Sequence, residues 1–231
     1  MNNQNNDVFR YERKFLLDKF SINSLEDLIQ YIPCDLYEKY QERKVNSVYY
    51  DNSNFSLAYE NIDGIFNRSK IRVRYYGNSN KLTSPKLEIK SKYGNVGKKD
   101  IFDLRSEDIY ESKFSLAFLK ELKFIESSKY NFFKLLCPIL KVSYKRKYFL
   151  STCNRFRITL DSNINFKIFD KNNIDNSLND NNLIYLNKNI LELKYAISDE
   201  DQACIFAKQL PARLSSTSKY LLAVKSLGLI K

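Results

Sequence analysis

Period-two alternation of charged and apolar residues is the feature that most constrains how this chain can fold. In residues 69–76, SKIRVRYY, the cations Lys70, Arg72 and Arg74 alternate with apolar side chains. Successive side chains of a β-strand point to opposite faces, so the three cations share one face of a predicted strand. A row of like charges is unfavourable, so that face needs either bulk water or an anion.

The same alternation returns in several other segments. It is found in RYERKF (10–15), KLEIKSK (86–92), RFRITLD (155–161) and ILELKY (190–195). An ordinary half-exposed sheet would place its charged face in water. The repetition instead favours an inside-out barrel, whose charged face lines a wet cavity and whose apolar face packs against helices. Same-face side chains repeat every ~6.6 Å, comparable with the span of two linked phosphates.

Carboxylates occupy some of these charged positions. Glu88 and Glu192 lie between apolar neighbours, and Glu12 shares its alternate positions with Arg10 and Lys14. They would partly neutralise a basic cavity. Their oxygens also suit Mg²⁺ or Mn²⁺, which prefer oxygen ligands.

The composition narrows the classes of function. The net charge of +11 implies an anionic partner: nucleic acid, an acidic membrane surface or a phosphate-rich small molecule. The chain has no histidine and no CxxC motif, which argues against a zinc site and against Ser-His or Cys-His catalysis. The four cysteines are scattered and fit buried positions in a reducing compartment.

The pattern predicts one domain of about eight strands with inserted helices. Nine segments are strand candidates, at 9–17, 44–51, 57–62, 69–76, 85–93, 96–104, 141–150, 155–161 and 189–196. Helices are expected at 22–32, 105–136, 198–210 and 218–229. Residues 1–7 are expected to be a disordered tail before a single domain at 8–231. The Asn-rich segment 170–189 is expected to be a hairpin loop or insertion. No signal region and no run of 18 apolar residues is found, which predicts a cytoplasmic protein, able to contact the inner face of a membrane peripherally.

Seven segments carry a resemblance to a known family. They are RYERKF, RSKIRVRYYG, KLEIKSK, YKRKYF, RFRITLD, ILELKY and LSSTSKY, in that order over nearly the whole chain. Together they resemble the VTC domain, the polyphosphate-polymerase domain of the vacuolar transporter chaperone complex and its bacterial relatives. That domain belongs to the CYTH, or triphosphate tunnel metalloenzyme, superfamily. Each motif alone is weak, but seven in order are specific.

The resemblance implies a fold and an activity. The fold is α+β, an eight-stranded antiparallel β tunnel barrel with a basic interior and helices packed outside. The activity is transfer of the ATP γ-phosphate onto a polyphosphate chain, with Mn²⁺ or Mg²⁺ as the divalent metal. ATP and pyrophosphate or polyphosphate would be the ligands, and a membrane protein is a further possible partner.

The resemblance implies roles for individual residues, and the shared charged face adds Lys70, Glu12 and Glu88 to them. The catalytic set is Arg72, Arg74, Lys90, Arg157 and Lys219. The substrate-binding set is Lys14, Lys70, Lys98, Lys99, Tyr144, Arg146 and Ser218. The metal ligands are Glu192, Glu12 and Glu88.

Two departures from the family pattern bear on the activity. The superfamily's hydrolases often begin with Glu-x-Glu-x-Lys, whereas this chain has one acid, Glu12, before Lys14. That is the VTC-type pattern and argues against a pure triphosphatase. Ser216, in contrast, stands where polymerases of the eukaryotic complex carry a second lysine.

Three alternatives therefore stay open. The first is a hydrolase of inorganic triphosphate or nucleoside triphosphates on the same fold. The second is a polyphosphate-binding protein without catalysis. The third, a nucleic-acid protein, is disfavoured because it needs accessible cations with stacking aromatic residues, whereas these cations fall at lining positions.

Overall fold

An antiparallel sheet with a few helices makes up this computed structural model. The structure describes residues 10–18, 24, 26, 27, 29, 35–77, 82–94, 96–116, 133–210, 212, 214–216 and 218–230. The strands are β1 (Arg10–Asp18), β2 (Leu36–Asp51), β3 (Asn67–Tyr76), β4 (Thr83–Tyr93), β5 (Val96–Asp103), β6 (Cys137–Ser151), β7 (Arg157–Ile168), β8 (Ile184–Tyr185) and β9 (Lys188–Ala196). Their order in the sheet is β1-β9-β7-β6-β2-β3-β4-β5, and β8 pairs with β7.

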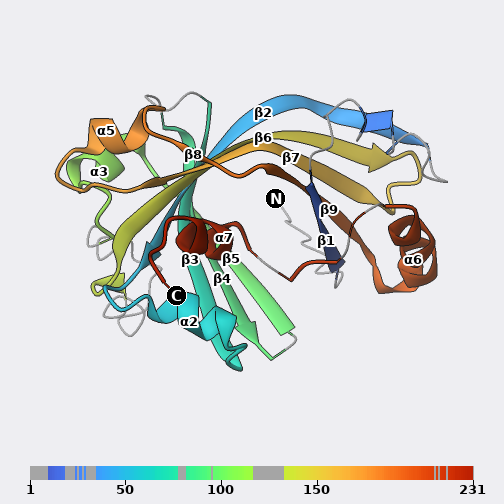
Figure 1. The fold of residues 1–231 in the computed structure, drawn as a ribbon, viewed down its shortest axis with the longest axis horizontal. Helices are drawn as coiled ribbons and strands as arrows, with labels where there is room; N and C mark the ends of the chain where they lie inside the picture. Colours follow the sequence, from blue (N-terminus) through green and yellow to red (C-terminus); the bar gives the residue numbers. More distant parts are fainter. Residues whose placement is uncertain are drawn as a thin grey trace, which may run out of the picture. The chain divides into compact units, whose positions relative to one another are not determined.

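Short helices lie between the strands and after the last strand, β9 (Figure 1). They are α2 (Ser56–Ile62), α3 (Ser106–Glu111), α5 (Ile174–Leu178), α6 (Glu200–Gln209) and α7 (Lys219–Ser226), with a 3-10 turn at Ile197–Asp199. None of the helices in the described part of the chain has the length and apolar character that a membrane span requires.

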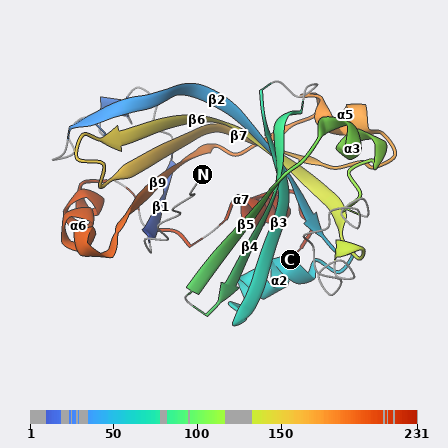
Figure 2. The ribbon, with the colours of Figure 1, turned by 180° about the vertical axis from the view of Figure 1, so that it is seen from behind.

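The chain divides into two compact units, which are described separately. Unit 1 comprises residues 1–43, 145–164 and 186–216, and unit 2 comprises 44–144, 165–185 and 217–231. In unit 1, Phe15, Leu160, Leu191 and other apolar residues form one core, against which α6 packs beside β9 (Figure 2). That the units together form the single domain expected at 8–231 stays a prediction.

Unit 2 has its own core, built on one face of β3 and β4. Ile71, Val73 and Tyr75 are almost completely buried there, whereas the residues between them are half-buried on the other face. Figure 1 shows β3, β4 and β5 side by side, and the strands pair antiparallel throughout. The alternation in the sequence thus becomes one apolar and one charged face, as expected for a strand.

One expected strand is a helix. Residues 57–62 were predicted to be extended, but they form most of α2. The carboxylate of Asp51 accepts hydrogen bonds from the backbone N–H groups of Leu57 (3.0 Å) and Ala58 (2.9 Å), which are otherwise unsatisfied at a helix start. The prediction was wrong because this stabilising contact comes from outside the segment.

Other boundaries also differ from the prediction. β2 begins at Leu36, eight residues before the expected strand. The helix expected at 198–210 starts at Glu200, after a 3-10 turn at Ile197–Asp199. In the expected helix 105–136, α3 ends at Glu111, and residues 117–132 lie outside the described residues, as do the tail 1–7 and most of the expected helix 22–32.

The Asn-rich segment 170–189 is partly ordered, with α5 and β8 inside it. Lys141 is fully buried beneath it and donates to the carbonyl oxygens of Leu178 (2.6 Å) and Asn179 (3.0 Å). Burial lowers the pKa of Lys141 to about 8, despite the nearby carboxylate of Asp180. The lysine thereby satisfies carbonyl groups at the end of α5.

Candidate functional site

A series of cations lies on the face of β3, β4 and β5 opposite the unit 2 core. The strand register places Arg68 opposite Lys92, Lys70 opposite Lys90, and Arg74 opposite Lys86, while Lys90 also faces Lys99 of β5. We call this set the cationic ladder: Arg68, Lys70, Arg72, Arg74, Lys86, Lys90, Lys92 and Lys99. Like charges directly opposite each other destabilise a sheet, so the ladder favours binding of an anion.

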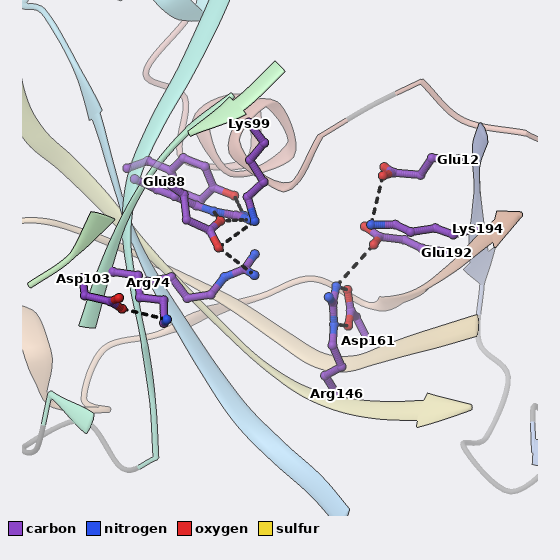
Figure 3. Close-up of polar contacts among 12 residues, drawn as sticks. Glu12, Arg74, Glu88, Lys99, Asp103, Arg146, Asp161, Glu192 and Lys194 are labelled. Carbon is purple, nitrogen blue, oxygen red and sulfur yellow. Dashed lines mark hydrogen bonds and ion pairs between the residues drawn. The ribbon is translucent and has the colours of Figure 1, made fainter. Parts of the chain in front are cut away.

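Glu88 is the single acidic residue in the ladder's alternating positions on β3 and β4. Its Oε2 accepts hydrogen bonds from Arg72 Nε (2.8 Å) and Nη2 (2.6 Å). Its Oε1 accepts from Lys99 Nζ (2.9 Å) and lies 3.3 Å from Arg74 Nη1 (Figure 3). Although burial opposes its ionisation, these three cations lower the pKa of Glu88 to about 2.

The surroundings of Glu88 do not fit the metal-ligand role predicted for it. Both carboxylate oxygens are already directed at cations, and a metal ion would have to displace them. The same three cations that would repel a metal ion would attract an anion. The structure therefore places Glu88 as an internal counter-ion of the ladder.

The two neighbouring lysines of β5 fall on different faces. Lys99 belongs to the ladder, where burial lowers its pKa despite the opposing effect of Glu88. Lys98 pairs in register with Ser91, on the opposite face, and forms an ion pair with Asp100 (3.0 Å). Of the two lysines predicted together, only Lys99 points toward the other predicted residues.

Three consecutive residues at the start of α7 make different contacts within unit 2. The hydroxyl of Ser218 caps the helix by accepting from the backbone N–H of Leu221 (3.2 Å). Lys219 is buried, with its Nζ 4.8 Å from the ring centroid of Tyr144. Tyr220 stacks on Tyr49, with ring centroids 5.1 Å apart. Two predicted site residues, Tyr144 and Lys219, are thus in contact, whereas Ser218 is the N-cap of α7.

Tyr49 was missed by the sequence reasoning. It lies opposite Arg72 in the β2–β3 register, and its hydroxyl accepts from Arg72 Nη1 (2.9 Å). Tyr49 and Glu88 raise the pKa of Arg72 although burial acts in the opposite direction. A signal was present, because Ser47, Tyr49 and Asp51 occupy alternate positions of an expected strand.

A second group of charges lies on one face of β1, β9 and β7 in unit 1. Glu12 is opposite Lys194, which is opposite Arg157, and Lys14 is opposite Glu192, which is opposite Thr159. Glu12 forms ion pairs with Lys14 (2.6 Å) and Lys194 (3.2 Å). We call this set, with Arg146 and Asp161, the unit 1 charged face.

Arg146 makes the tightest contacts of the unit 1 charged face. Its Nε and Nη2 donate to the two oxygens of Asp161 (2.5 and 2.6 Å), and its Nη2 lies 3.5 Å from Glu192 (Figure 3). Asp161 is fully buried and was not among the predicted site residues. Its position two residues after Thr159 in RFRITLD could have indicated it.

The described residues contain no group of three or more His, Cys, Asp or Glu side chains placed to hold a metal. Two predicted ligands, Glu12 and Glu192, nevertheless lie on adjacent strands and offer oxygen donors. Mg²⁺ is often held by one or two carboxylates plus substrate phosphates, rather than by a complete protein cage. The chemistry of Glu192 fits that arrangement. Glu12, like Glu88, directs both carboxylate oxygens at cations, so it would hold a metal only after releasing Lys14 or Lys194.

Comparison with protein families identifies one match. The VTC domain family model matches residues 9–228. No curated protein matches the chain significantly.

Several solved structures share the fold. A Hippeastrum protein described as having a dominant triphosphatase activity aligns with a TM-score of 0.56 and 13% identity, over 94% of this chain and 96% of its own. A candidate adenylate cyclase from Bacillus halodurans aligns with a TM-score of 0.54 and 14% identity, over 93% of this chain and 95% of its own. The PH1819 protein of Pyrococcus horikoshii aligns with a TM-score of 0.51 and 13% identity, over 95% of this chain and 99% of its own. These likenesses confirm the predicted fold class, the antiparallel triphosphate tunnel fold.

Proposed function

The chain belongs to the VTC domain family, and on this premise we propose that it is a polyphosphate polymerase-like phosphotransferase using ATP. The observation that carries the proposal is the cationic ladder. Its β3 members, from Arg68 to Arg74, extend over six residue steps, or ~20 Å of strand. A ligand with phosphates linked in a row matches such a series of cations better than an isolated phosphate does.

The reaction needs positioning and charge neutralisation rather than a protein nucleophile. An oxygen of the terminal acceptor phosphate would attack the γ-phosphorus of ATP. A new P–O bond forms, the bond from the γ-phosphorus to the β–γ bridging oxygen breaks, and ADP leaves with that electron pair. No side chain takes part covalently, which accords with a chain that has no histidine.

Within unit 2, we assign phosphate binding to Arg72, Arg74, Lys90 and Lys99, with Lys70 and Lys219 as further contacts. Arginine suits this role because its planar guanidinium can donate two parallel hydrogen bonds to phosphate oxygens. Arg72 and Arg74 now share the Glu88 carboxylate. An incoming phosphate would therefore compete with Glu88 for donors that are already assembled, and little reorganisation would be required.

Within unit 1, we assign anion binding to Lys14 and Arg157, and metal binding to Glu192, which Glu12 would join only after releasing Lys14 or Lys194. A divalent metal, when bound, would supply positive charge to phosphate oxygens. Arg146 differs from the others because Asp161 already neutralises it. Its contribution would be to position Glu192, from which its Nη2 is 3.5 Å.

Triphosphate hydrolysis on the same fold is the second candidate. Ser216 in place of a lysine and the triphosphatase activity described for the Hippeastrum protein favour it. The polymerase and hydrolase reactions differ only in the group that accepts the γ-phosphate, which is a phosphate chain in the first and water in the second.

One assay separates the candidates. The purified chain is supplied with ATP, Mn²⁺ and a pyrophosphate primer, and the products are resolved on a polyphosphate gel. A ladder of chains supports the polymerase, and free phosphate alone supports the hydrolase. Tripolyphosphate binding without ATP turnover would indicate a binding protein. Arg72→Ala and Glu192→Ala should abolish turnover, and near wild-type rates in both would contradict the proposed site.

A further inference from the structure

The hydroxyl of Tyr49 has an unused donor beside Arg72 of the cationic ladder. Tyr49 is 5% exposed, and its oxygen accepts from Arg72. A guanidinium has no acceptor atom, so the proton of the tyrosine hydroxyl is not used in that contact. Among the described residues no acceptor for this proton is found. A buried donor without an acceptor is costly, which makes it a marker of a missing partner.

Two neighbouring polar atoms on the same face also lack a hydrogen-bond partner among the described residues. Ser47 Oγ and Arg74 Nε are buried and have no hydrogen-bond partner within the described residues. Ser47 and Arg74 are directly opposite each other in the β2–β3 register, two residues along from the Tyr49–Arg72 pair. The three unsatisfied groups thus occupy adjacent positions where β2 meets β3.

Contacts from unit 2 hold the Tyr49 ring in place. The ring stacks on Tyr220, with an interplanar angle of 18°. The hydroxyl of Tyr220 donates to the carboxylate of Asp51 (2.7 Å), which is fully buried and also accepts from the start of α2. The Tyr49 hydroxyl is therefore preorganised, and its donor would not have to be ordered when a ligand binds.

We propose that β2 supplies a subsite of uncharged donors beside the cationic ladder. In it, the hydroxyls of Tyr49 and Ser47 bind oxygens of the phosphate that Arg72 and Arg74 hold. The ligand class is an inorganic or nucleoside polyphosphate, whose oxygens can accept from several donors at once. The inference rests on the proposed function and adds Tyr49 and Ser47 to its substrate contacts.

Calorimetric titration with tripolyphosphate tests the subsite. A hydrogen bond to a charged acceptor contributes enough that Tyr49→Phe should weaken binding about tenfold. Ser47→Ala should weaken it by about fivefold, and this variant leaves the acceptor of Arg72 intact. The two substitutions therefore distinguish direct donation to the ligand from an effect through Arg72.

Tyr50→Phe is the matched control. Tyr50 is adjacent in sequence, and its buried hydroxyl likewise has no partner among the described residues, but it belongs to the unit 2 core. The Tyr50→Phe variant should bind tripolyphosphate with the wild-type affinity. Thermal unfolding should show that this variant, Tyr49→Phe and Ser47→Ala are all folded.

The outcomes separate the two proposals. Wild-type affinity in both Tyr49→Phe and Ser47→Ala would overturn the subsite while the proposed function stands. Weakened binding in Tyr50→Phe equal to that in Tyr49→Phe would also overturn it. A wild-type chain that neither binds tripolyphosphate nor consumes ATP would contradict the proposed function, and the subsite with it.

Discussion

The charged faces of the two units use similar residues in different proportions. In unit 2, Arg72, Arg74 and Lys99 share one carboxylate, Glu88. In unit 1, Arg146 is matched by Asp161 and Glu192, and Glu12 by two lysines. Unit 2 therefore carries excess positive charge and attracts anions, whereas unit 1 largely neutralises itself. Similar strand patterns can thus produce charged faces that differ in how much of their positive charge is neutralised.

The largest effect is expected on activity when an arginine of the unit 2 face is removed. Arg72→Ala should lower ATP turnover by about 10³-fold, since an arginine that stabilises a transferring phosphoryl group contributes on this scale. Phosphate release and the polyphosphate gel measure it. Arg105→Ala, in an exposed pair with Asp108 on α3, is the control and should retain full activity. Equal loss in both variants would indicate a general folding defect.

Stability should respond more strongly in unit 1. Arg146→Ala leaves Asp161 as a buried carboxylate without its main partner, which should cost about 3–5 kcal/mol of the free energy of unfolding. Urea denaturation measures the loss. The double variant Arg146→Leu, Asp161→Leu should recover most of it, because the unpaired charge is removed. An unchanged midpoint for Arg146→Ala would show that this pair is not a structural element.

Acid should weaken unit 2 through Glu88. The folded-state pKa of Glu88 is about 2, below its ordinary value of 4.5, so its ionisation stabilises the fold. That contribution, about 3 kcal/mol, is complete above pH 4.5 and is lost as the pH falls toward 2. Glu88→Gln should lack this part of the pH dependence when denaturation is followed from pH 7 to pH 2. It should also bind tripolyphosphate more tightly, and weaker binding would contradict the counter-ion role.

The smallest expected effect separates two adjacent lysines. Lys99→Ala should weaken tripolyphosphate binding about tenfold, because it removes a charge-assisted contact from the ladder. Lys98→Ala, on the opposite face, should leave the affinity unchanged. Calorimetry at one salt concentration measures both. Equal losses would mean that net charge, rather than position on the strand, governs binding.

Much of the fold and part of the site could be predicted because strand geometry is local. The period of two determines that Lys70, Arg72 and Arg74 share a face, whatever the rest of the chain does. The order of seven motifs was sufficient to indicate the family and the fold class. The exception, the helix at Ser56–Ile62, depends on Asp51 accepting from its first turn, which the segment itself does not reveal.

The partners of the charged groups were decided by tertiary structure. Alternation along the chain gave Glu88, Glu12 and Glu192 the same expected role as metal ligands. Only the pairing of β3, β4 and β5 surrounds Glu88 with three cations. Tyr49 and Tyr220 are far apart in the chain, and their contact beside Arg72 exists only after α7 has packed. The sequence by itself determined which residues face together, since that follows from backbone period. Their pKa values and free donors depend on distances between strands, which only folding sets.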